Sequence, residues 1–232
     1  MKTVVVTGGV RGIGRAIAEA FLQKQYRVCV CYSKDEEAAE SARAAGLEVY
    51  RVDVRDERAV ADFFKAIGKV DILVNNAGVS LWAMIQDTTA EQIDEVFAIN
   101  VRGTILCCRE ALKSMLSYHS GLIVNISSVW GEVGGCCESV YSASKGAVLA
   151  FTKALAKEVG YSGIRVNAVS PGMIETKMNA RFTGEDLDAI RAETPAGRFG
   201  RVDEVAQAVL FLEENEYITG IDLPINGGFS IV

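Results

Sequence analysis

The chain has 232 residues, half of them hydrophobic, which is enough to bury a sizeable core without disulfide or metal support. Its 24 basic and 30 acidic residues give a net charge of −6 and lie scattered, which disfavours nucleic acid and anionic membranes as partners. An apolar run begins at Val4, leaving no room for a targeting segment, and no apolar run reaches the length of a membrane span. We therefore expect a single domain over residues 1–232, located in the cytoplasm.

Apolar runs and helical periodicity alternate along the whole chain. The pattern predicts strands at 4–6, 28–32, 49–52, 72–74, 122–126, 165–169 and 221–223, and helices over 14–25, 36–45, 60–67, 90–111 and 140–159. Strands that are apolar throughout and separated by helices indicate a parallel sheet covered on both faces. With right-handed crossovers, this predicts a doubly wound, Rossmann-type α/β fold with a mostly parallel seven-stranded sheet and ligands at the carboxyl ends of the strands.

Residues 173–200 form the longest segment without a predicted strand. The segment is polar, with isolated helical spacing. We interpret it as a lid over the substrate; the alternative is a surface excursion without a function.

The six cysteines and the single histidine do not form the pattern of a metal site. Cys29 and Cys31 alternate within an apolar run, and the other four cysteines form adjacent pairs at 107–108 and 136–137. No Cys-x-x-Cys spacing is present, and His119 alone cannot build an all-histidine zinc site. We predict reduced thiols and no metal, with ordinary packing favoured over redox sensitivity for the 136–137 pair.

A glycine-rich loop lies between the first predicted strand and the first predicted helix. Glycine allows a tight turn and a close backbone approach to a pyrophosphate, whose charge the helix N-terminus stabilises. The spacing differs from the usual G-x-G-x-x-G, so the position of the loop carries the prediction. We expect a nicotinamide dinucleotide to be bound here by five residues: Gly8, Gly9, Gly12, Ile13 and Gly14.

The end of the second predicted strand bears on the choice between NADH and NADPH. Sites for NAD usually carry an acidic residue there, and this chain has none before Asp35. Arg11 could pair with a 2′-phosphate and Ser33 could donate a hydrogen bond to it, which favours NADP(H) over NAD(H). The alternatives are that Arg11 is a solvated loop residue and that Asp35 reaches the ribose.

Two further strand ends supply candidate cofactor contacts. Asp53 and Val54 end the third predicted strand and are placed to meet the adenine. Asn76, Ala77 and Gly78 follow the fourth and would line the nicotinamide ribose. Alternatively, the asparagines at 75 and 76 satisfy buried backbone groups.

Tyr141 and Lys145 lie four residues apart on a predicted helix and therefore on one face of it. A lysine cation about 4 Å from a phenolate stabilises it by roughly 4 kcal/mol at an effective dielectric constant near 20. This lowers a tyrosine pKa by about three units, toward physiological pH. Such a tyrosine can give a proton to a carbonyl oxygen while hydride reaches the carbon. Ser128, at the end of another predicted strand, would hydrogen-bond the same oxygen.

Over essentially its whole length the chain resembles the classical short-chain dehydrogenase/reductase family. The matching positions are Thr7 to Gly14, Asp53, Asn75 to Gly78, Asn100, Ser128, Tyr141, Lys145 and Pro171-Gly172. The resemblance implies that Ser128 positions the carbonyl, that Tyr141 is the general acid/base, and that Tyr141 and Lys145 also contact the cofactor.

The same resemblance assigns roles to residues that spacing alone leaves open. It implies that Asn100 holds a water linking Lys145 to solvent; from the residues alone, Asn100 is a helix-kinking polar residue. It also implies cofactor contacts from Pro171 and Gly172 and carboxamide contacts from Ile174 and Thr176. Family members form homotetramers, so we expect a homotetramer or homodimer in which residues 221–232 are interface as well as core.

Within the family the resemblance is greatest to the 3-oxoacyl-[acyl-carrier-protein] reductases, which implies reduction of a carrier-linked ketone to a secondary alcohol. The loops at 118–121 and 161–163 carry no lysine or arginine to attract an acidic carrier, although Lys113 and Lys157 lie nearby. The segment 128–138 is similar to that of the elongation factor P 5-aminopentanone reductases, which reduce a ketone attached to a lysine of that factor. An aminoketone linked to this translation factor is therefore the alternative substrate.

Three residues of the segment 128–138 are candidate substrate contacts. Trp130 offers an apolar wall, and Glu132 or Glu138 could pair with a substrate ammonium; the alternative is that both glutamates are solvated loop residues. A non-catalytic NADP-binding sensor on the same fold is a further alternative. A sensor would be expected to lose Tyr141 or Lys145, and both are present.

Overall fold

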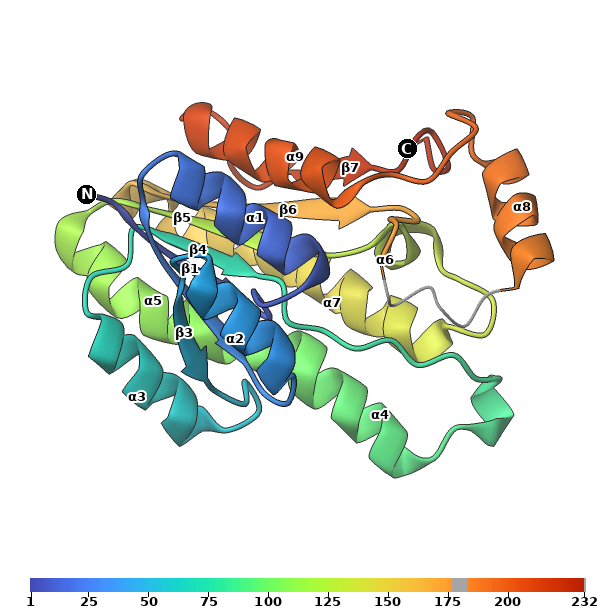
Figure 1. Ribbon diagram of the computed structural model, residues 1–232, viewed down its shortest axis with the longest axis horizontal. Helices are drawn as coiled ribbons and strands as arrows, with labels where there is room; N and C mark the ends of the chain where they lie inside the picture. The colour runs from blue at the N-terminus through green and yellow to red at the C-terminus, as the bar shows by residue number, and fades with distance from the viewer. Residues whose placement is uncertain (177–182, 232) are drawn as a thin grey trace.

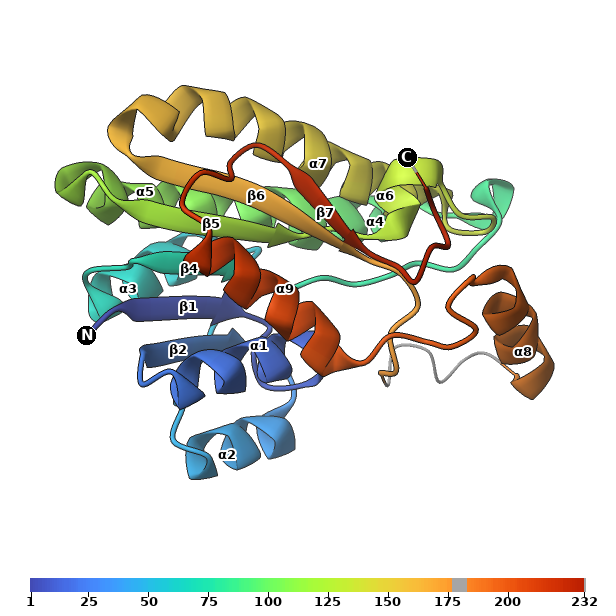
Figure 2. The ribbon, with the colours of Figure 1, turned by 90° about the horizontal axis from the view of Figure 1, so that it is seen from above.

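The computed structural model describes residues 1–176 and 183–231. Its sheet has seven parallel strands in the order β3-β2-β1-β4-β5-β6-β7, and all of them run in one direction in Figure 2. The strands are β1 Thr3–Thr7, β2 Arg27–Tyr32, β3 Glu48–Arg51, β4 Ile72–Asn75, β5 Gly121–Ile126, β6 Ile164–Pro171 and β7 Asp222–Ile225. Because the strand order reverses between β1 and β4, the loops at their carboxyl ends diverge and leave a crevice for a ligand.

Helices cover both faces of this sheet, as Figures 1 and 2 show. Val4 and Val6 pack with α1, α2 and α9, whereas Val5 packs with α3, α5 and α7, because successive side chains of a strand point to opposite faces. This confirms the predicted doubly wound α/β fold. The α-helices are α1 Gly12–Gln23, α2 Glu36–Ala44, α3 Glu57–Ile67, α4 Ala90–Phe97, α5 Thr104–Tyr118, α6 Val129–Val133, α7 Ser139–Val159, α8 Gly184–Glu193 and α9 Val202–Glu214. None of the helices within the described ranges combines the length and apolar character needed to cross a membrane.

The structure corrects the sequence-based elements in three places. The predicted helix 90–111 is two helices, α4 and α5, joined by the π-helical turn η2, Ala98–Gly103. The last strand begins at Asp222 rather than at position 221 and reaches Ile225, where Pro171 of β6 is its partner. Helices α6, α8 and α9 were not predicted. The buried residues Val205, Val209 and Leu212 of α9 nevertheless recur at helical spacing.

Candidate active site

The loop after β1 is braced by residues that follow β4. The hydroxyl of Thr7 accepts hydrogen bonds from the backbone N–H groups of Asn76 and Ala77, both at 3.0 Å. The side chain of Asn76 donates to the carbonyl oxygens of Thr7 (3.0 Å) and Gly8 (3.1 Å). A Cβ atom on Gly14 would stand 2.4 Å from the Asn76 amide nitrogen and 2.4 Å from the Gly8 oxygen, so only glycine fits there. The Asn76 side chain thus supports the loop.

The first turn of α1 matches what a dinucleotide pyrophosphate requires. Arg11 precedes the helix without a side-chain cap, and the first turn carries no acidic residue. Gly12 is exposed, with φ at +55°, and a Cβ atom on it would meet only Thr176, at 3.8 Å. A bare glycine surface beside uncapped backbone N–H groups lets a phosphate approach the positive end of the helix dipole. The neighbouring Ile13 is half-buried and packs against the core, so its side chain anchors the turn.

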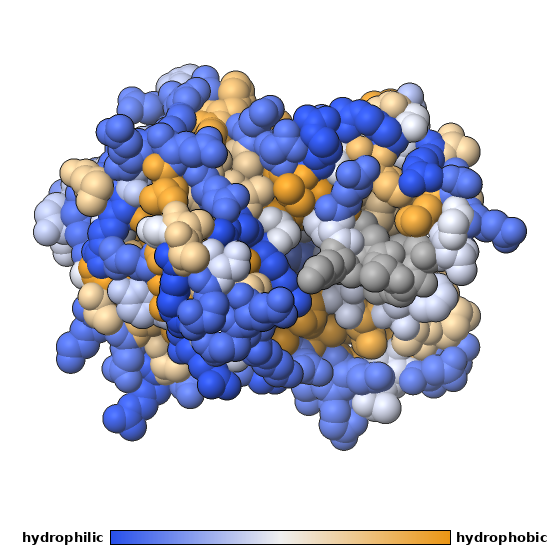
Figure 3. All heavy atoms as spheres, viewed as in Figure 1, coloured by the Kyte–Doolittle hydropathy of each residue, from blue (hydrophilic) through white to orange (hydrophobic). Residues whose placement is uncertain are grey.

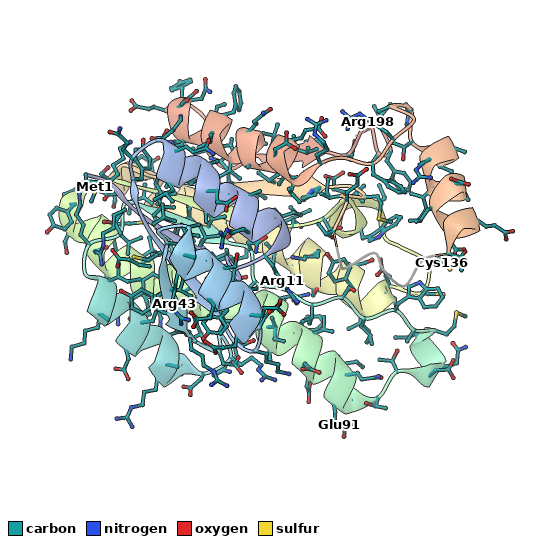
Figure 4. All side chains as sticks on the ribbon, viewed as in Figure 1. Met1, Arg11, Arg43, Glu91, Cys136 and Arg198 are labelled. Atoms are coloured by element: carbon teal, nitrogen blue, oxygen red, sulfur yellow. The ribbon has the colours of Figure 1, made fainter. Side chains whose placement is uncertain are left out.

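At the end of β2, Arg11 forms an ion pair with Asp35 at 3.0 Å, and Figure 4 labels Arg11 at the start of α1. Asp35 also caps α2, because its other carboxylate oxygen accepts from the N–H of Ala38 at 3.1 Å. Ser33, two residues before Asp35, is exposed. Arg11, the residue that favours NADPH, and Asp35, the residue that could favour NADH, are therefore paired with each other. Asp35 is also held in place as the N-cap of α2.

The residues expected at the adenine lie after β3. Arg55 donates to Asp53 from its backbone N–H and its guanidinium, and this holds the pKa of Asp53 below its usual value. Val54 is buried, and a Cβ atom on Gly103 would be 2.8 Å from its Cγ2 atom. The side chain of Val54 is thus part of the core. A contact between Val54 and an adenine would therefore be made by its backbone atoms.

The two asparagines after β4 have separate surroundings. Asn75 is buried and donates to the Oδ1 atom of Asn125 at 2.9 Å, and Asn125 donates in turn to the hydroxyl of Thr152 at 2.8 Å. This chain of hydrogen bonds ties β4, β5 and α7 together inside the protein. Asn75 therefore has a structural environment, away from the crevice.

Lys145 on α7 is buried beneath the residues that end β4 and β5. Its ammonium group donates to the carbonyl oxygen of Ile126 at 2.8 Å and lies 5.8 Å from the centroid of the Tyr141 ring. A Cβ atom on Gly78 would be only 3.5 Å from this nitrogen. Burial penalises the charged form and lowers the pKa of Lys145 to about 8. The ammonium is thus placed beside the tyrosine in a medium of low dielectric constant.

Asn100 lies in the π-helical turn η2, and its side-chain amide is fully engaged. Its Oδ1 atom accepts from the N–H of Val79, and its Nδ2 atom donates to the Val79 oxygen, both at 2.9 Å, and to the Ser144 hydroxyl at 3.0 Å. Ser144 donates in turn to the carbonyl oxygen of Tyr141 at 2.7 Å. Single π-helical turns often mark functional sites, because the extra residue redirects the backbone. Here the turn directs Asn100 toward α7.

Ser128 lies where β5 meets α6. Its hydroxyl accepts from the N–H of Trp130 at 3.2 Å and so caps α6. The adjacent Ser127 donates to the carbonyl oxygen of Lys145 at 3.0 Å, and a Cβ atom on Gly131 would be 2.9 Å from the carbonyl carbon of Lys145. Both contacts fix Ser128 beside the turn of α7 that carries Tyr141 and Lys145. We call Asn100, Ser128, Tyr141 and Lys145 the candidate catalytic centre.

The three candidate substrate contacts have different environments. Trp130 packs edge-to-face on Phe229, with ring centroids 5.3 Å apart. Glu138 is buried, with 5% of its surface exposed. Both carboxylate oxygens of Glu132 are also covered, and Asp222 lies beside them. Neither glutamate therefore presents an exposed carboxylate for a substrate ammonium.

The lid predicted at 173–200 is described except for residues 177–182. Its two ends meet in a bridge between Ile174 and Gly200, and α8 lies within it. Pro171 is buried at its base, and Gly172 donates to the Ile225 oxygen at 3.0 Å. A cavity of about 270 Å³ opens between the lid and the C-terminal segment, lined by Met173, Thr194, Ala196, Arg198, Gly200, Glu204 and residues 224–228. No residue of the candidate catalytic centre lines it.

Figure 3 shows the face of the molecule that carries α1, α2 and α8. Hydrophilic residues dominate over α1 and α2, and apolar residues gather toward the centre of the face, between these helices and α8. An apolar centre with a polar rim suits a small organic ligand.

Several residues of the site were not predicted from the sequence. Ser127, Gly131 and Ser144 fix the catalytic centre, and Asp222 faces Glu132. Ser127, Gly131 and Ser144 lie within three residues of a predicted catalytic residue, so their proximity was a usable signal. Asp222 gave no such signal.

A glycine loop at a helix N-terminus, with a buried lysine beside a tyrosine at the same edge of a parallel sheet, defines a dinucleotide-dependent oxidoreductase. Known proteins agree: the family model described as enoyl-(acyl carrier protein) reductase matches residues 8–230. Carbonyl reductase family member 4 of Xenopus tropicalis is 43% identical over 236 residues, covering 99% of this chain and 98% of its own. The 3-oxoacyl-[acyl-carrier-protein] reductase of Homo sapiens is 39% identical over 237 residues, covering 100% and 99%.

Solved structures give the same result. ElxO with NADP bound matches with a TM-score of 0.89 and 35% identity, and the match covers 98% of each chain. The chain therefore belongs to the short-chain dehydrogenase/reductase family and is an NAD(P)-dependent oxidoreductase. This confirms the family inferred from the sequence motifs.

Proposed function

We propose that this chain uses NADPH to reduce a ketone to a secondary alcohol, and that its substrate is a 3-oxoacyl group carried on acyl carrier protein. The observation that carries the proposal is the buried Lys145 ammonium, 5.8 Å from the centre of the Tyr141 ring and with its pKa lowered to about 8. The substrate class follows from the human relative, which is named a 3-oxoacyl-[acyl-carrier-protein] reductase.

The roles of the residues follow from their positions. A bound nicotinamide dinucleotide supplies the hydride for the carbonyl carbon. Tyr141 donates its phenolic proton to the carbonyl oxygen, and the Lys145 ammonium stabilises the phenolate that remains. Ser128 donates a hydrogen bond to the same oxygen and orients it. Asn100 keeps the adjoining turn of α7 in place through Ser144.

The preference for NADPH rests on the end of β2. Arg11 is two-thirds exposed and within reach of a phosphate, whereas Asp35 is committed to capping α2. When a 2′-phosphate arrives, Arg11 exchanges one anionic partner for another, and Ser33 can add a hydrogen bond. The phosphate, with its larger charge, is the stronger partner.

The test is NADPH oxidation with acetoacetyl-acyl-carrier protein, run beside elongation factor P that bears the lysine-linked ketone. Turnover of the carrier-linked substrate that is lost in Tyr141→Phe supports the proposal. The matched control is Tyr217→Phe, since Tyr217 is fully exposed after the end of α9 and should leave the rate unchanged. Turnover of the modified elongation factor alone would replace the proposed substrate by the aminoketone.

We also propose that the protein works as a homotetramer, with the carrier-linked ketone as its partner. Exposed apolar side chains lie where such an assembly would bury them: Ile105 and Leu116 on α5, Phe211 on α9, and Ile221 and Ile231 in the C-terminal part. Their loss from water on association would stabilise the assembly. Light scattering of the purified protein tests this, and a monomer at micromolar concentration would contradict it.

A further inference from the structure

Two carboxyl groups, of Glu132 on α6 and Asp222 on β7, lie side by side. Both carboxylate oxygens of Glu132 are shielded from solvent, and no N–H or O–H of the described residues forms a hydrogen bond to them. The polar group beside them is the carboxyl of Asp222. Ser170 of β6 donates to Asp222, with its hydroxyl 2.8 and 2.7 Å from the two carboxylate oxygens.

Within the described parts of the chain, no lysine or arginine contacts the Glu132 carboxylate. Asp222 faces Glu132 from β7, Ser170 from β6 and Ser230 from the C-terminal segment, and the Ser230 hydroxyl is not aligned for a hydrogen bond. From α7 the backbone of Lys145 approaches Gly131 of α6, but its ammonium donates to the oxygen of Ile126. Because the Glu132 oxygens are covered and lie beside a second carboxyl group, the charged form of Glu132 is disfavoured. Burial, and after it Asp222, raises the pKa of Glu132 to about 7.

The pair lies at a sensitive place for catalysis. Helix α6 has five residues, begins immediately after Ser128, and packs through Gly131 against the backbone of Lys145. Two side-chain contacts join it to the C-terminal part: Glu132 with Asp222 and Ser230, and Trp130 with Phe229. A change in the first contact therefore moves the element that orients Ser128.

We propose that a proton shared between Glu132 and Asp222 fastens α6 to β7 and thereby holds Ser128 in position for the reacting carbonyl. Both acids are positioning residues, since neither belongs to the candidate catalytic centre, and the inference rests on the proposed ketone reduction. Loss of the proton places two negative charges side by side, which repel and displace α6. A displacement of about 1 Å at a catalytic group can reduce a rate by about a hundredfold.

The first test is the pH dependence of kcat for wild type and Glu132→Gln, measured between pH 5.5 and 8.5 with saturating NADPH and ketone. Glutamine mimics the protonated acid and can donate to Asp222. We expect wild-type kcat to fall at least tenfold as pH rises through about 7, and the variant to keep its low-pH rate until the Lys145 ammonium titrates near pH 8. The matched control is Glu91→Gln, an exposed position on α4 that should follow wild type. A Glu132→Gln profile with the wild-type decline overturns the proposal.

A second measurement reports on the pair without using activity. Infrared difference spectra between wild type and Glu132→Gln should show a protonated carboxylic acid at pH 6 that is lost by pH 8.5. In a Trp82→Phe background, where Trp130 is the only tryptophan, its fluorescence should shift over the same pH range. Absence of the acid band at pH 6, or titration without a fluorescence shift, overturns the proposal. If both signals titrate but no ketone is reduced, the proton and the movement of α6 stand and the proposed function fails.

Discussion

The candidate catalytic centre and the substrate side of the same crevice are built in different ways. The side chains of the centre are held by partners within or next to the sequence motifs, as when Ser127 holds Lys145 and Asn76 holds the glycine loop. The substrate side consists of α6, the described parts of 173–200 and the C-terminal residues 222–231. Its contacts join residues about a hundred positions apart, such as Trp130 with Phe229. The candidate catalytic centre is thus held by contacts between the sequence motifs, whereas the substrate side is held by segments outside them.

The largest effect is expected from a substitution in the candidate catalytic centre. Lys145→Met should reduce kcat by about 10²–10⁴-fold, because the phenolate of Tyr141 loses its cation. Thermal stability should stay equal or rise, since a buried ammonium is replaced by an apolar side chain of similar length. Steady-state kinetics and a thermal melt check both. Lys153→Met, exposed on the same helix, is the control, and an equal loss there would contradict the assigned role.

A smaller effect is expected at the glycine loop. In Gly14→Ala the new methyl group overlaps the Asn76 amide and the Gly8 oxygen, each 2.4 Å away. We expect a loss of about 1–3 kcal/mol, divided between folding and NADPH binding. Fluorescence titration with NADPH and urea unfolding measure the two parts. Gly184→Ala, whose new methyl group meets no atom of the described residues within 4 Å, should change neither.

The substrate side predicts a pH-dependent change in stability. The unfolded chain releases the Glu132 proton near pH 4.5, whereas the folded protein keeps it to about pH 7. The stabilising contribution is therefore fully present below pH 4.5 and is lost as pH rises through about 7. Glu132→Gln should match wild type in urea unfolding at pH 5 and exceed it by roughly 1–3 kcal/mol at pH 8. Equal stabilities at both pH values would remove the basis for a buried proton.

The smallest effect is expected at Arg11, on the exposed edge of the cofactor site. Arg11→Ala should weaken NADPH binding by about tenfold and leave NADH binding unchanged, because only NADPH carries the 2′-phosphate. Competition between the two cofactors at fixed ketone concentration measures the ratio. A parallel loss for both cofactors would show that Arg11 serves the pyrophosphate or the fold instead.

Much of the centre was predictable from the sequence because its determinants are local. A four-residue separation places Tyr141 and Lys145 on one helical face whatever the rest of the chain does. A glycine loop between a strand and a helix likewise defines a phosphate site, and apolar runs define a parallel sheet. The family and the seven-stranded fold were predicted on these grounds, and the comparisons confirm them.

The tertiary structure decided what depends on distant partners. Periodicity predicts one helix over 90–111, but the contacts of Asn100 with Val79 and Ser144 accompany a π-helical turn that no local pattern shows. Glu132 has the sequence context of a solvated loop residue, yet it is placed against Asp222, 90 positions later along the chain. Local sequence sets which residue types are available to the site. Burial and the charges of distant neighbours set their protonation, because solvation and Coulomb energies depend on distance in space.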